Sequence, residues 1–438
     1  MMTPNSCPDS LASTASTVVS DKGHVAVKGP TARQCRFCAA PLRTTFVDLG
    51  MSPLCESYVP ADALNHMEPF YPLHVFLCDQ CFLVQLDEYV TPGNIFTEYA
   101  YFSSFSDSWV EHARRYVEQI VSRLQLGPTA RVFEIASNDG YLLQHFVAKG
   151  IPVLGIEPAA NVAQVAVEKG VPTVVRFFGA QTASDIARST GHGDLIVANN
   201  VLAHVPDIND FVRGAKILLK PTGTITMEFP HLVRLMAGNQ FDTIYHEHFS
   251  YLSLTTVQRI FNAHGLRVHD VEELSTHGGS LRIYASHLEA QQPLTPAVLE
   301  LVKREETFGL GRVETYARFS AQVQETKRKL LLFLIDAKRG GRTVAGYGAP
   351  GKGNTLLNYC GIRTDFVDYT VDRNPYKHGK FLPGSRIPIF PPERIRETRP
   401  DYVLILPWNL KDEVVAQLAY IRKWGGKFVV PIPEVEVF

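Results

Sequence analysis

The hydrophobic pattern of the middle of the chain changes period at regular intervals. Residues 105–126 repeat apolar positions at helical spacing, and Gly127-Pro128 ends this segment. Short apolar runs then alternate with helical segments that begin near Tyr141, Asn161 and Asn209. These runs lie at residues 131–136, 153–156, around Val174, 194–198 and 223–229. Such alternation predicts a mostly parallel sheet with helices on both faces, whose ligands bind beyond the carboxyl ends of the strands.

The alternation returns in the last third of the chain. A long helical stretch covers residues 296–339 and leads into a strand, turn and helix at residues 344–355. Further strands are expected at residues 365–371 and 402–405. The predicted fold is therefore α/β, with a small N-terminal part (31–90), a central doubly wound sheet (91–290) and a C-terminal Rossmann-like part (291–438).

Composition narrows the class of protein. The 438 residues are 45% hydrophobic and 20% charged with a net charge of −1, which favours neither nucleic acid nor an anionic membrane as partner. No apolar run approaches the about 20 residues that a membrane-spanning helix needs. Residues 1–30 are rich in Ser, Thr, Ala and Val without a basic start, which predicts a disordered leader and a cytoplasmic protein.

Four of the seven cysteines form two CxxC pairs, Cys35/Cys38 and Cys78/Cys81, about forty residues apart. Each pair can offer two thiolates to one tetrahedral ion, so the pattern predicts a closed, structural zinc site. A redox disulfide or coincidence is the alternative, and disulfides are disfavoured in cytoplasm. Between the pairs lie three further potential ligands, Cys55, His66 and His74.

Polar residues follow three of the central strands. A tight turn follows the first strand, Glu157 ends the second where a carboxylate can accept both ribose hydroxyls, and Asn199-Asn200 follows the fourth. A nicotinamide dinucleotide fold would need glycine where Ala136 and Asn138 stand. The pattern therefore favours S-adenosylmethionine over NAD, with a degenerate, non-binding domain as the remaining alternative. The candidate cofactor residues are Glu134, Ser137, Asn138, Asp139, Gly140, Glu157, Asn199 and Asn200.

The cluster Tyr245-His246-Glu247-His248 follows the fifth strand. Its spacing excludes an H-E-x-x-H zinc site, because the two imidazoles are not one helical turn apart. Histidine has the pKa suited to proton removal at neutral pH. The carboxylate could orient that histidine, and the phenol could donate to a developing enolate oxygen. Acid/base chemistry on a carbon acid is the function this cluster indicates.

A second glycine-rich turn opens the C-terminal part, in GYGAPGKGNT. Backbone N–H groups and a lysine at a helix start form an anion cradle, but the turn is not a P-loop. A partner that carries a diphosphate is expected; the alternative is a domain that serves only for docking. The candidate substrate residues are Tyr347, Gly348, Lys352, Gly353, Asn354, Asp372, Asn374 and Lys377.

The ordered motifs resemble the deoxysugar C-methyltransferase family, which acts on nucleotide-linked 4-keto-deoxysugars in antibiotic biosynthesis. The two CxxC pairs are followed by EIASNDGYLL, GIEP, FFGA, NNVLAHV, YHEHFSYLSL, HGGSLRIY and GYGAPGKGNTLLN, and the likeness runs from Cys35 to the C-terminus. It implies a monomeric three-domain enzyme with zinc, S-adenosylmethionine and a nucleotide-sugar substrate, with dTDP as the expected nucleotide.

The resemblance also implies roles for individual residues. His248 is the expected base, with Tyr245, Glu247, His204 and Tyr99 as further catalytic groups. It adds Ala136, Pro158, Phe178, Gly179 and Ala180 to the cofactor residues, although similar sequences commonly carry glycine at position 136. Methylation at C3 of the sugar is favoured; C5, an O- or N-methyltransferase and a non-catalytic scaffold are the alternatives.

Overall fold

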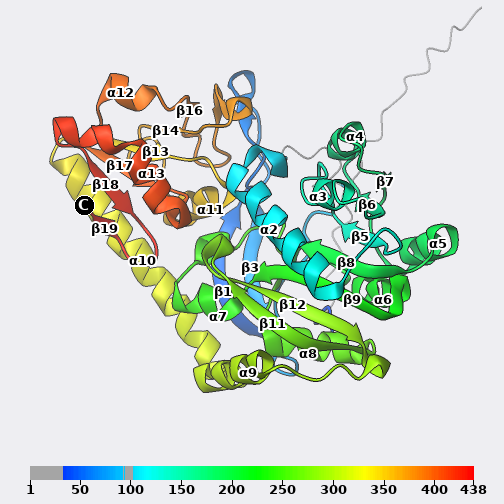
Figure 1. The fold of residues 1–438 in the computed structure, drawn as a ribbon. Helices are drawn as coiled ribbons and strands as arrows, with labels where there is room; N and C mark the ends of the chain where they lie inside the picture. Colours follow the sequence, from blue (N-terminus) through cyan, green and yellow to red (C-terminus); the bar gives the residue numbers. More distant parts are fainter. Residues whose placement is uncertain (1–32, 92, 94–101) are drawn as a thin grey trace, which may run out of the picture.

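The described part of the chain contains three larger β-sheets with their helices and one two-stranded sheet (Figure 1). The computed structural model describes residues 33–91, 93 and 102–438, so the expected leader and Tyr99 lie outside the described residues. Within this described part, no helix combines the length and apolar character that crossing a bilayer requires. The α/β class and the order of the three parts agree with the sequence prediction.

The N-terminal sheet is antiparallel and includes a strand from the central part of the chain. Its order is β1 (Thr44–Ser52), β3 (Tyr71–Leu77), β4 (Val84–Leu86) and β10 (Ser250–Tyr251). A separate short strand, β2 (Val59–Pro60), pairs with β15 (Lys380–Phe381) of the C-terminal part. The N-terminal part is thus bonded to both of the others by β-pairing.

The four paired cysteines come together at one end of this sheet. Their sulfur atoms all lie within 4.8 Å of one another, and the closest pairs, Cys35–Cys81 and Cys38–Cys78, are 3.5 Å apart. A disulfide would need about 2.05 Å, whereas sulfurs about 2.3 Å from one tetrahedral ion fit the observed separations. Four thiolates leave no open position, so a zinc ion here is structural. The predicted ligand set is confirmed, and Cys55 lies outside it.

The central sheet has seven strands, in the order β11-β12-β9-β8-β5-β6-β7. Strands β5 to β9 are parallel to one another. At one edge β12 pairs antiparallel with β9, and β11 pairs antiparallel with β12. The strands are β5 (Val132–Ile135), β6 (Val153–Glu157), β7 (Thr173–Val175), β8 (Gly193–Asn199), β9 (Leu219–Pro230), β11 (Leu266–Leu274) and β12 (Ser280–His287). The order reverses between β5 and β8, where ligands of such sheets bind.

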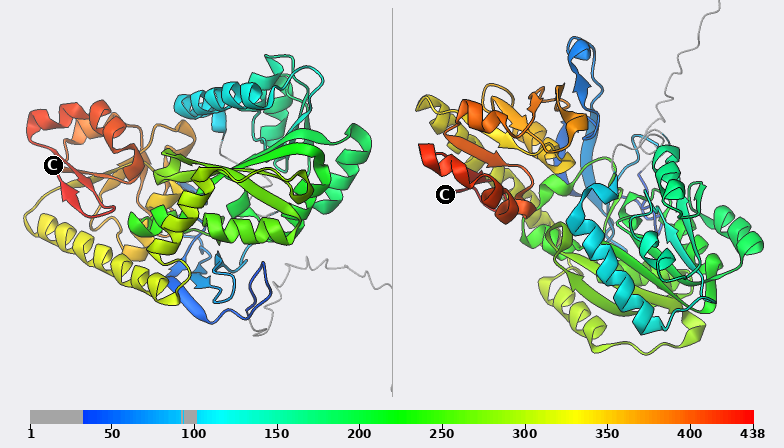
Figure 2. Two further views of the ribbon diagram at one scale, coloured as in Figure 1. Left: turned by 60° about the horizontal axis from the view of Figure 1, so that its bottom comes forward. Right: turned by 45° about the horizontal axis from the view of Figure 1, so that its top comes forward.

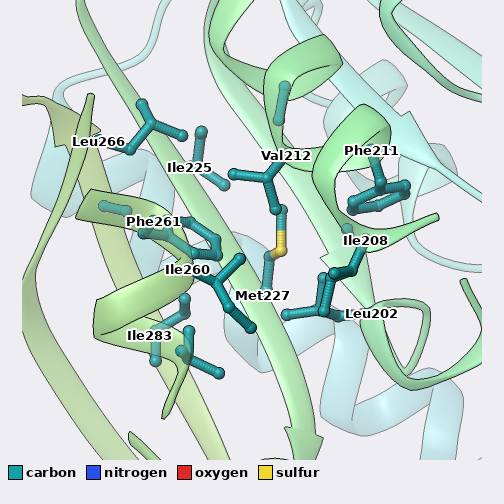
Figure 3. Packing of buried hydrophobic residues seen from close by; sticks show 14 of the residues in the cluster. Leu202, Ile208, Phe211, Val212, Ile225, Met227, Ile260, Phe261, Leu266 and Ile283 are labelled. Atoms are coloured by element: carbon teal, nitrogen blue, oxygen red, sulfur yellow. The ribbon is translucent and has the colours of Figure 1, made fainter. Parts of the chain in front are cut away.

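The helices of the central part connect these strands, apart from α2, which precedes β5. They are α2 (Asp107–Leu124), α3 (Leu143–Val147), α4 (Ala160–Glu168), α5 (Ala180–Thr190), α6 (Ile208–Leu218), α7 (Leu232–Ala237) and α8 (Leu254–Ala263). Figure 3 shows Val212 of α6 and Ile260 of α8 packing over Ile225 and Met227 of β9. These side chains are fully buried. This packing fixes the strand ends that carry the candidate site residues.

The C-terminal sheet is a second, smaller parallel arrangement. Its order is β16-β14-β13-β17-β18-β19, with only β19 antiparallel. The strands are β13 (Val344–Tyr347), β14 (Tyr369–Val371), β16 (Ile389–Phe390), β17 (Tyr402–Ile405), β18 (Lys427–Val430) and β19 (Glu436–Val437). Its helices are α11 (Gly351–Cys360), α12 (Arg394–Thr398) and α13 (Lys411–Gln417). The predicted Rossmann-like character is confirmed, although the strand expected at 365–371 is shorter.

The long helical stretch before this sheet is two helices, α9 (Pro296–Phe308) and α10 (Val313–Arg339). Gly309 ends the first with a φ of 97°, a conformation that glycine adopts without strain. Helix α10 then runs along the outside from the central part to the C-terminal sheet (Figures 1 and 2). Its Phe319 stacks on Phe46 of β1 at 4.7 Å between ring centroids, so this helix also contacts the N-terminal sheet.

We predict that Cys35→Ser removes the metal and destabilises the N-terminal sheet, because structural zinc contributes folding free energy directly. Elemental analysis of protein purified without chelator should give one equivalent of zinc for the wild type. The matched control is Cys360→Ala, a buried cysteine outside the cluster, which should keep its zinc. Less than half an equivalent in the wild type would refute the site.

Candidate active site

Two turns at the edge of the central sheet are tied together by one carboxylate. After β5 the chain turns through Ala136 and Asn138, with φ of 55° and 49°. Glu157, at the end of β6, accepts hydrogen bonds from the backbone N–H groups of Asn138 and Ala159, both at 2.9 Å. Burial raises the pKa of Glu157 in spite of these bonds. Each oxygen keeps a further lone pair for a ligand hydroxyl.

Several buried polar atoms at this edge have no hydrogen-bond partner among the described residues. They are Glu134 Oε2, Ser137 Oγ and Asn199 Oδ1. Burial, together with the charges of Glu157 and Asp139, raises the pKa of Glu134 well above its ordinary value. Buried polar groups normally have partners, so these three mark the place of a polar ligand. Asp139 bonds Lys169 through Oδ2 at 3.0 Å, while its Oδ1 is also buried without a partner among the described residues.

The remaining candidate cofactor residues surround this edge in different ways. Phe178 packs against Phe211 at 5.4 Å between ring centroids, and the Ala180 N–H donates to Asp210 at 3.1 Å. Gly179 precedes α5, Pro158 is half-buried beside Glu157, and Gly140 has a φ of 75°. Asn200 has a φ of 56° and donates its N–H to the Glu228 carbonyl at 2.8 Å. Their contact with a cofactor stays a prediction.

The His248 ring is oriented by a hydrogen bond to a backbone carbonyl. Its Nδ1 lies 2.8 Å from the carbonyl oxygen of Thr243. A carbonyl can only accept, so Nδ1 carries the proton and Nε2 of the neutral ring is left as the base. Tyr245 and His204 lie against this ring, at 4.0 and 4.6 Å between ring centroids. Burial, and then the charge of His204, lowers the pKa of His248 well below 6.5.

The other two members of the motif contact different parts of the molecule. His246 is buried and bonds the Pro72 carbonyl of β3 at 3.2 Å. The Glu247 carboxyl lies 3.8 Å from the Cys55 thiol, and burial followed by the charge of Glu56 raises its pKa to about 8. The expectation that a carboxylate orients His248 is therefore corrected: Nδ1 of this ring bonds a backbone carbonyl.

His277 lies beside the candidate site. It is the first residue of the HGGSLRIY motif, but the sequence gives it no predicted role. It lies in η5 (Thr276–Gly278) with a φ of 53°, rare for a residue with a side chain. Its Nε2 is 3.4 Å from Asn200 Nδ2, and its ring meets Trp109 at 5.3 Å between centroids. Desolvation by the surrounding protein, and then the charge of Lys352, lowers the pKa of His277 to about 4. By surface area the residue is exposed. Its position directly before two glycines was the available signal.

The glycine-rich turn of the C-terminal part faces the same region. Lys352 donates to Asn409 Oδ1 at 2.7 Å and lies 4.9 Å from the centroid of the Trp408 ring. Trp408 donates from Nε1 to Asp242 at 2.7 Å, six residues before His248. The start of α11 is therefore joined to the loop that carries the candidate base.

The other candidate substrate residues are largely engaged in internal bonds. Asp372 accepts from the Ala349 N–H at 2.7 Å and from the Asn374 N–H at 2.8 Å. Lys377 donates to the Ala349 carbonyl at 2.8 Å. Tyr347 is buried and donates to Gln417 at 2.7 Å. Gly348 has a φ of 88°, Gly353 packs against Leu406, and Asn354 Nδ2 is buried without a partner among the described residues.

A loop from the N-terminal part, residues 53–60, completes this region. Tyr58 donates from its hydroxyl to the Ala349 carbonyl at 2.6 Å. Cys55 lies so close to α11 that a Cβ at Gly351 would come within 2.9 Å of its sulfur. Glu56 lies beside it, and burial raises its pKa while the charge of Lys377 opposes the rise. Sequence patterns do not reveal the contacts of this loop with the start of α11, because Tyr58 and Ala349 are 291 positions apart.

Comparison with known proteins matches each of the three parts. Models of a zinc binding domain, a methyltransferase domain and a C-methyltransferase C-terminal domain match residues 35–96, 109–271 and 275–433. The C-methyltransferase NovU of Streptomyces niveus is 37% identical over 404 residues, which cover 92% of this chain and 96% of NovU.

Two further similarities involve the central part. A ubiquinone biosynthesis O-methyltransferase of Xanthomonas oryzae pv. oryzae is 30% identical over 111 residues, 25% of this chain and 46% of that protein. The structure of magnesium protoporphyrin IX methyltransferase (ChlM) from Synechocystis PCC 6803 with bound SAM covers 41% of this chain and 82% of its own. Its TM-score is 0.31 at 15% identity.

The match to NovU spans almost the whole of both chains and all three matched domains, in the same order as the sheets. The strand order, the edge of β5 and the four-cysteine cluster fit the cofactors that this family implies. The chain therefore belongs to the C-methyltransferase family and is an S-adenosylmethionine-dependent enzyme with a zinc-binding N-terminal domain.

Proposed function

We propose that this enzyme methylates a nucleotide-linked 4-keto-deoxysugar at a carbon next to the ketone, with C3 favoured and dTDP as the nucleotide. The observation that carries the proposal is the state of His248. Its Nδ1 is bonded to the Thr243 carbonyl, so the neutral ring presents Nε2 as a base beside Tyr245 and His204. A base fixed in this way suits removal of a proton from carbon.

The unpartnered atoms of Glu134, Ser137 and Asn199, with Glu157, fit a nucleoside at the ends of β5, β6 and β8. Glu157 would bond the ribose hydroxyls, because a carboxylate can accept from both. S-adenosylmethionine supplies an electrophilic methyl group when it is bound. The protein's own contribution is to hold the two reactants together, which alone can lower a barrier by about 7–11 kcal/mol.

The chemical step follows from the acidity of carbons next to a ketone. His248 Nε2 takes the proton, and the C–H electron pair moves into a new C=C bond while the carbonyl pair moves onto oxygen. Tyr245 and His204 flank the imidazole and supply donors for that oxygen. The enolate carbon would then form the bond to the methyl group as the methyl–sulfur bond breaks and its electron pair goes to sulfur, and the ketone is restored.

The C-terminal part supports a nucleotide-sugar as substrate. A glycine-rich turn at the start of α11 and the lysines Lys352 and Lys377 lie at the ends of β13 and β14, where parallel sheets bind ligands. The same features suit a C5-methyltransferase. An O- or N-methyltransferase would need a base but no neighbouring donor to stabilise an enolate. The phenol and imidazole beside His248 therefore favour methylation at carbon.

Hydrogen exchange tests the proposed function without the methyl donor. The enzyme in D₂O should replace the proton on one α-carbon of a dTDP-4-keto-6-deoxysugar, because exchange needs only the base and the enolate. NMR of the recovered sugar then shows whether C3 or C5 exchanges. A panel of such sugars that shows no exchange above the enzyme-free rate would reject the proposal.

We predict that His248→Asn binds S-adenosylmethionine and substrate but loses about 10²–10⁴-fold in both exchange and methylation, the usual cost of removing a general base. His192→Asn, an exposed histidine elsewhere on the central part, is the control and should behave as the wild type. If His248→Asn kept normal exchange while methylation fell, the base would be another group.

The lowered pKa of His248 predicts a pH profile. The neutral imidazole is the active form, and its folded-state pKa lies well below 6.5. Exchange measured as kcat/KM should therefore stay constant down to pH 6.5 and fall only at lower pH, as Nε2 is protonated. A midpoint of the acid limb above pH 6.5 would show that His248 is not the titrating base.

Glu157→Ala should weaken S-adenosylmethionine binding by about 1.5–3 kcal/mol, the value of a hydrogen bond to a charged group. Isothermal calorimetry measures the change, and zinc content with a thermal scan confirms the fold. Glu168→Ala, an exposed carboxylate on neighbouring α4, should leave the affinity unchanged. An unchanged affinity for Glu157→Ala would place the ribose elsewhere.

A further inference from the structure

Lys352 is a partly buried cation without a carboxylate ion-pair partner within 4.0 Å among the described residues. Its Nζ bonds only the neutral Asn409 amide, at 2.7 Å, and lies over the Trp408 ring. Asp242, the carboxylate whose charge acts on it, is itself bonded to Trp408 Nε1. A partly buried charge without an ion-pair partner is costly to maintain, and burial lowers the pKa of Lys352. Such a residue is suited to bind a ligand atom that carries negative charge.

Helix α11, which carries Lys352 in its first turn, is bonded directly to the loop that carries His248. Thr355 of this helix donates to the Ile244 carbonyl at 2.9 Å. The Tyr359 ring meets Phe241 edge-on at 5.4 Å between centroids. Ile244 and Phe241 precede His248 by a few residues, so α11 packs directly on the segment that leads to the base.

The ammonium group also acts on the histidines of the site. After burial and the charge of neighbouring imidazoles, the positive charge of Lys352 lowers the pKa of His248. It is the largest charge effect on His277, whose pKa burial already lowers. The Trp408 ring under Lys352 reaches Gly278, the neighbour of His277, and bonds Asp242, so the ammonium group lies beside the segments that carry both imidazoles.

We propose that Lys352 is a catalytic residue of the proton-transfer step, its ammonium group donating a hydrogen bond to the ketone oxygen of the substrate as that oxygen becomes an enolate. This proposal rests on the function proposed above. The proton moves from carbon to His248 Nε2 and the freed electron pair ends on the oxygen, beside the cation. Lys352 keeps its own protons throughout. When the α-carbon bonds the methyl group, the oxygen's electron pair remakes the carbonyl, and the pair of the broken methyl–sulfur bond stays on sulfur. A cation that the protein holds in place stabilises the enolate more than a cation in water does, because its charge is screened less in a partly buried site.

The same ammonium could instead bind the diphosphate of the substrate, as the glycine-rich turn predicted. The two roles differ in what they change. A group that contacts the enolate acts on the rate at saturating substrate and leaves ground-state affinity almost unaltered. A group that contacts the diphosphate acts on affinity, including that of dTDP without a sugar.

The test is Lys352→Met, which removes the charge and keeps an unbranched side chain. We expect the rate of deuterium exchange at saturating dTDP-4-keto-6-deoxysugar to fall by about 10²–10³-fold, as for loss of one oxyanion donor. The Kd of dTDP should stay within threefold of the wild type. Lys411→Met is the matched control, a lysine over the Phe438 ring at 4.4 Å and outside the site, and should exchange normally.

A near-normal exchange rate at saturation would overturn the proposal, and a large loss of dTDP affinity together with that rate would assign Lys352 to the diphosphate. Zinc content and S-adenosylmethionine affinity confirm that the variant folds. A second variant, Asn409→Asp, keeps the lysine but places a carboxylate beside its ammonium. It should also slow exchange at least tenfold, and an unchanged rate would contradict the proposal. If the wild type itself exchanged no sugar, the proposed function would fail instead.

Discussion

One short loop, residues 241–251, is held by all three parts of the molecule, and the geometry of the site depends on it. Its end forms β10, which pairs with β4 of the N-terminal sheet. The Phe249 N–H donates to the Ala203 carbonyl of the central part at 2.7 Å. Trp408 and Thr355 of the C-terminal part bond Asp242 and Ile244. A base on this loop cannot shift without breaking contacts in three places.

Because β10 of this loop pairs with the N-terminal sheet, the zinc site helps to position the base without taking part in the reaction. The Cys35 turn is docked on the central part, where Arg36 donates to the Pro206 carbonyl at 2.7 Å and Asn209 donates to the Arg36 carbonyl at 3.1 Å. Metal that fixes this turn also fixes the sheet in which β10 is the last strand. Because a displacement of about 1 Å can cost two orders of magnitude in rate, distant structural groups bear on catalysis.

Much of this arrangement can be predicted from the sequence, and the remainder has a physical reason for being hidden. The cysteine pairs, the strand-helix alternation and the turn after β5 are local patterns, so spacing alone identifies them. The bond between Asp242 and Trp408 joins positions 166 residues apart, and that between Tyr58 and Ala349 spans 291. No local periodicity encodes such contacts. The tautomer of His248 depends likewise on a backbone carbonyl, which any residue at position 243 would provide.

The likeness to known C-methyltransferases and the geometry of His248 lead to one central claim, that the new bond joins two carbons. Reaction with S-adenosylmethionine labelled with ¹³C in its methyl group, followed by NMR of the product sugar nucleotide, tests this claim most directly. The account predicts a labelled methyl group bonded to a carbon next to the carbonyl, with a ¹³C–¹³C coupling when the sugar ring is also labelled. A labelled methyl group attached to oxygen or nitrogen would contradict it.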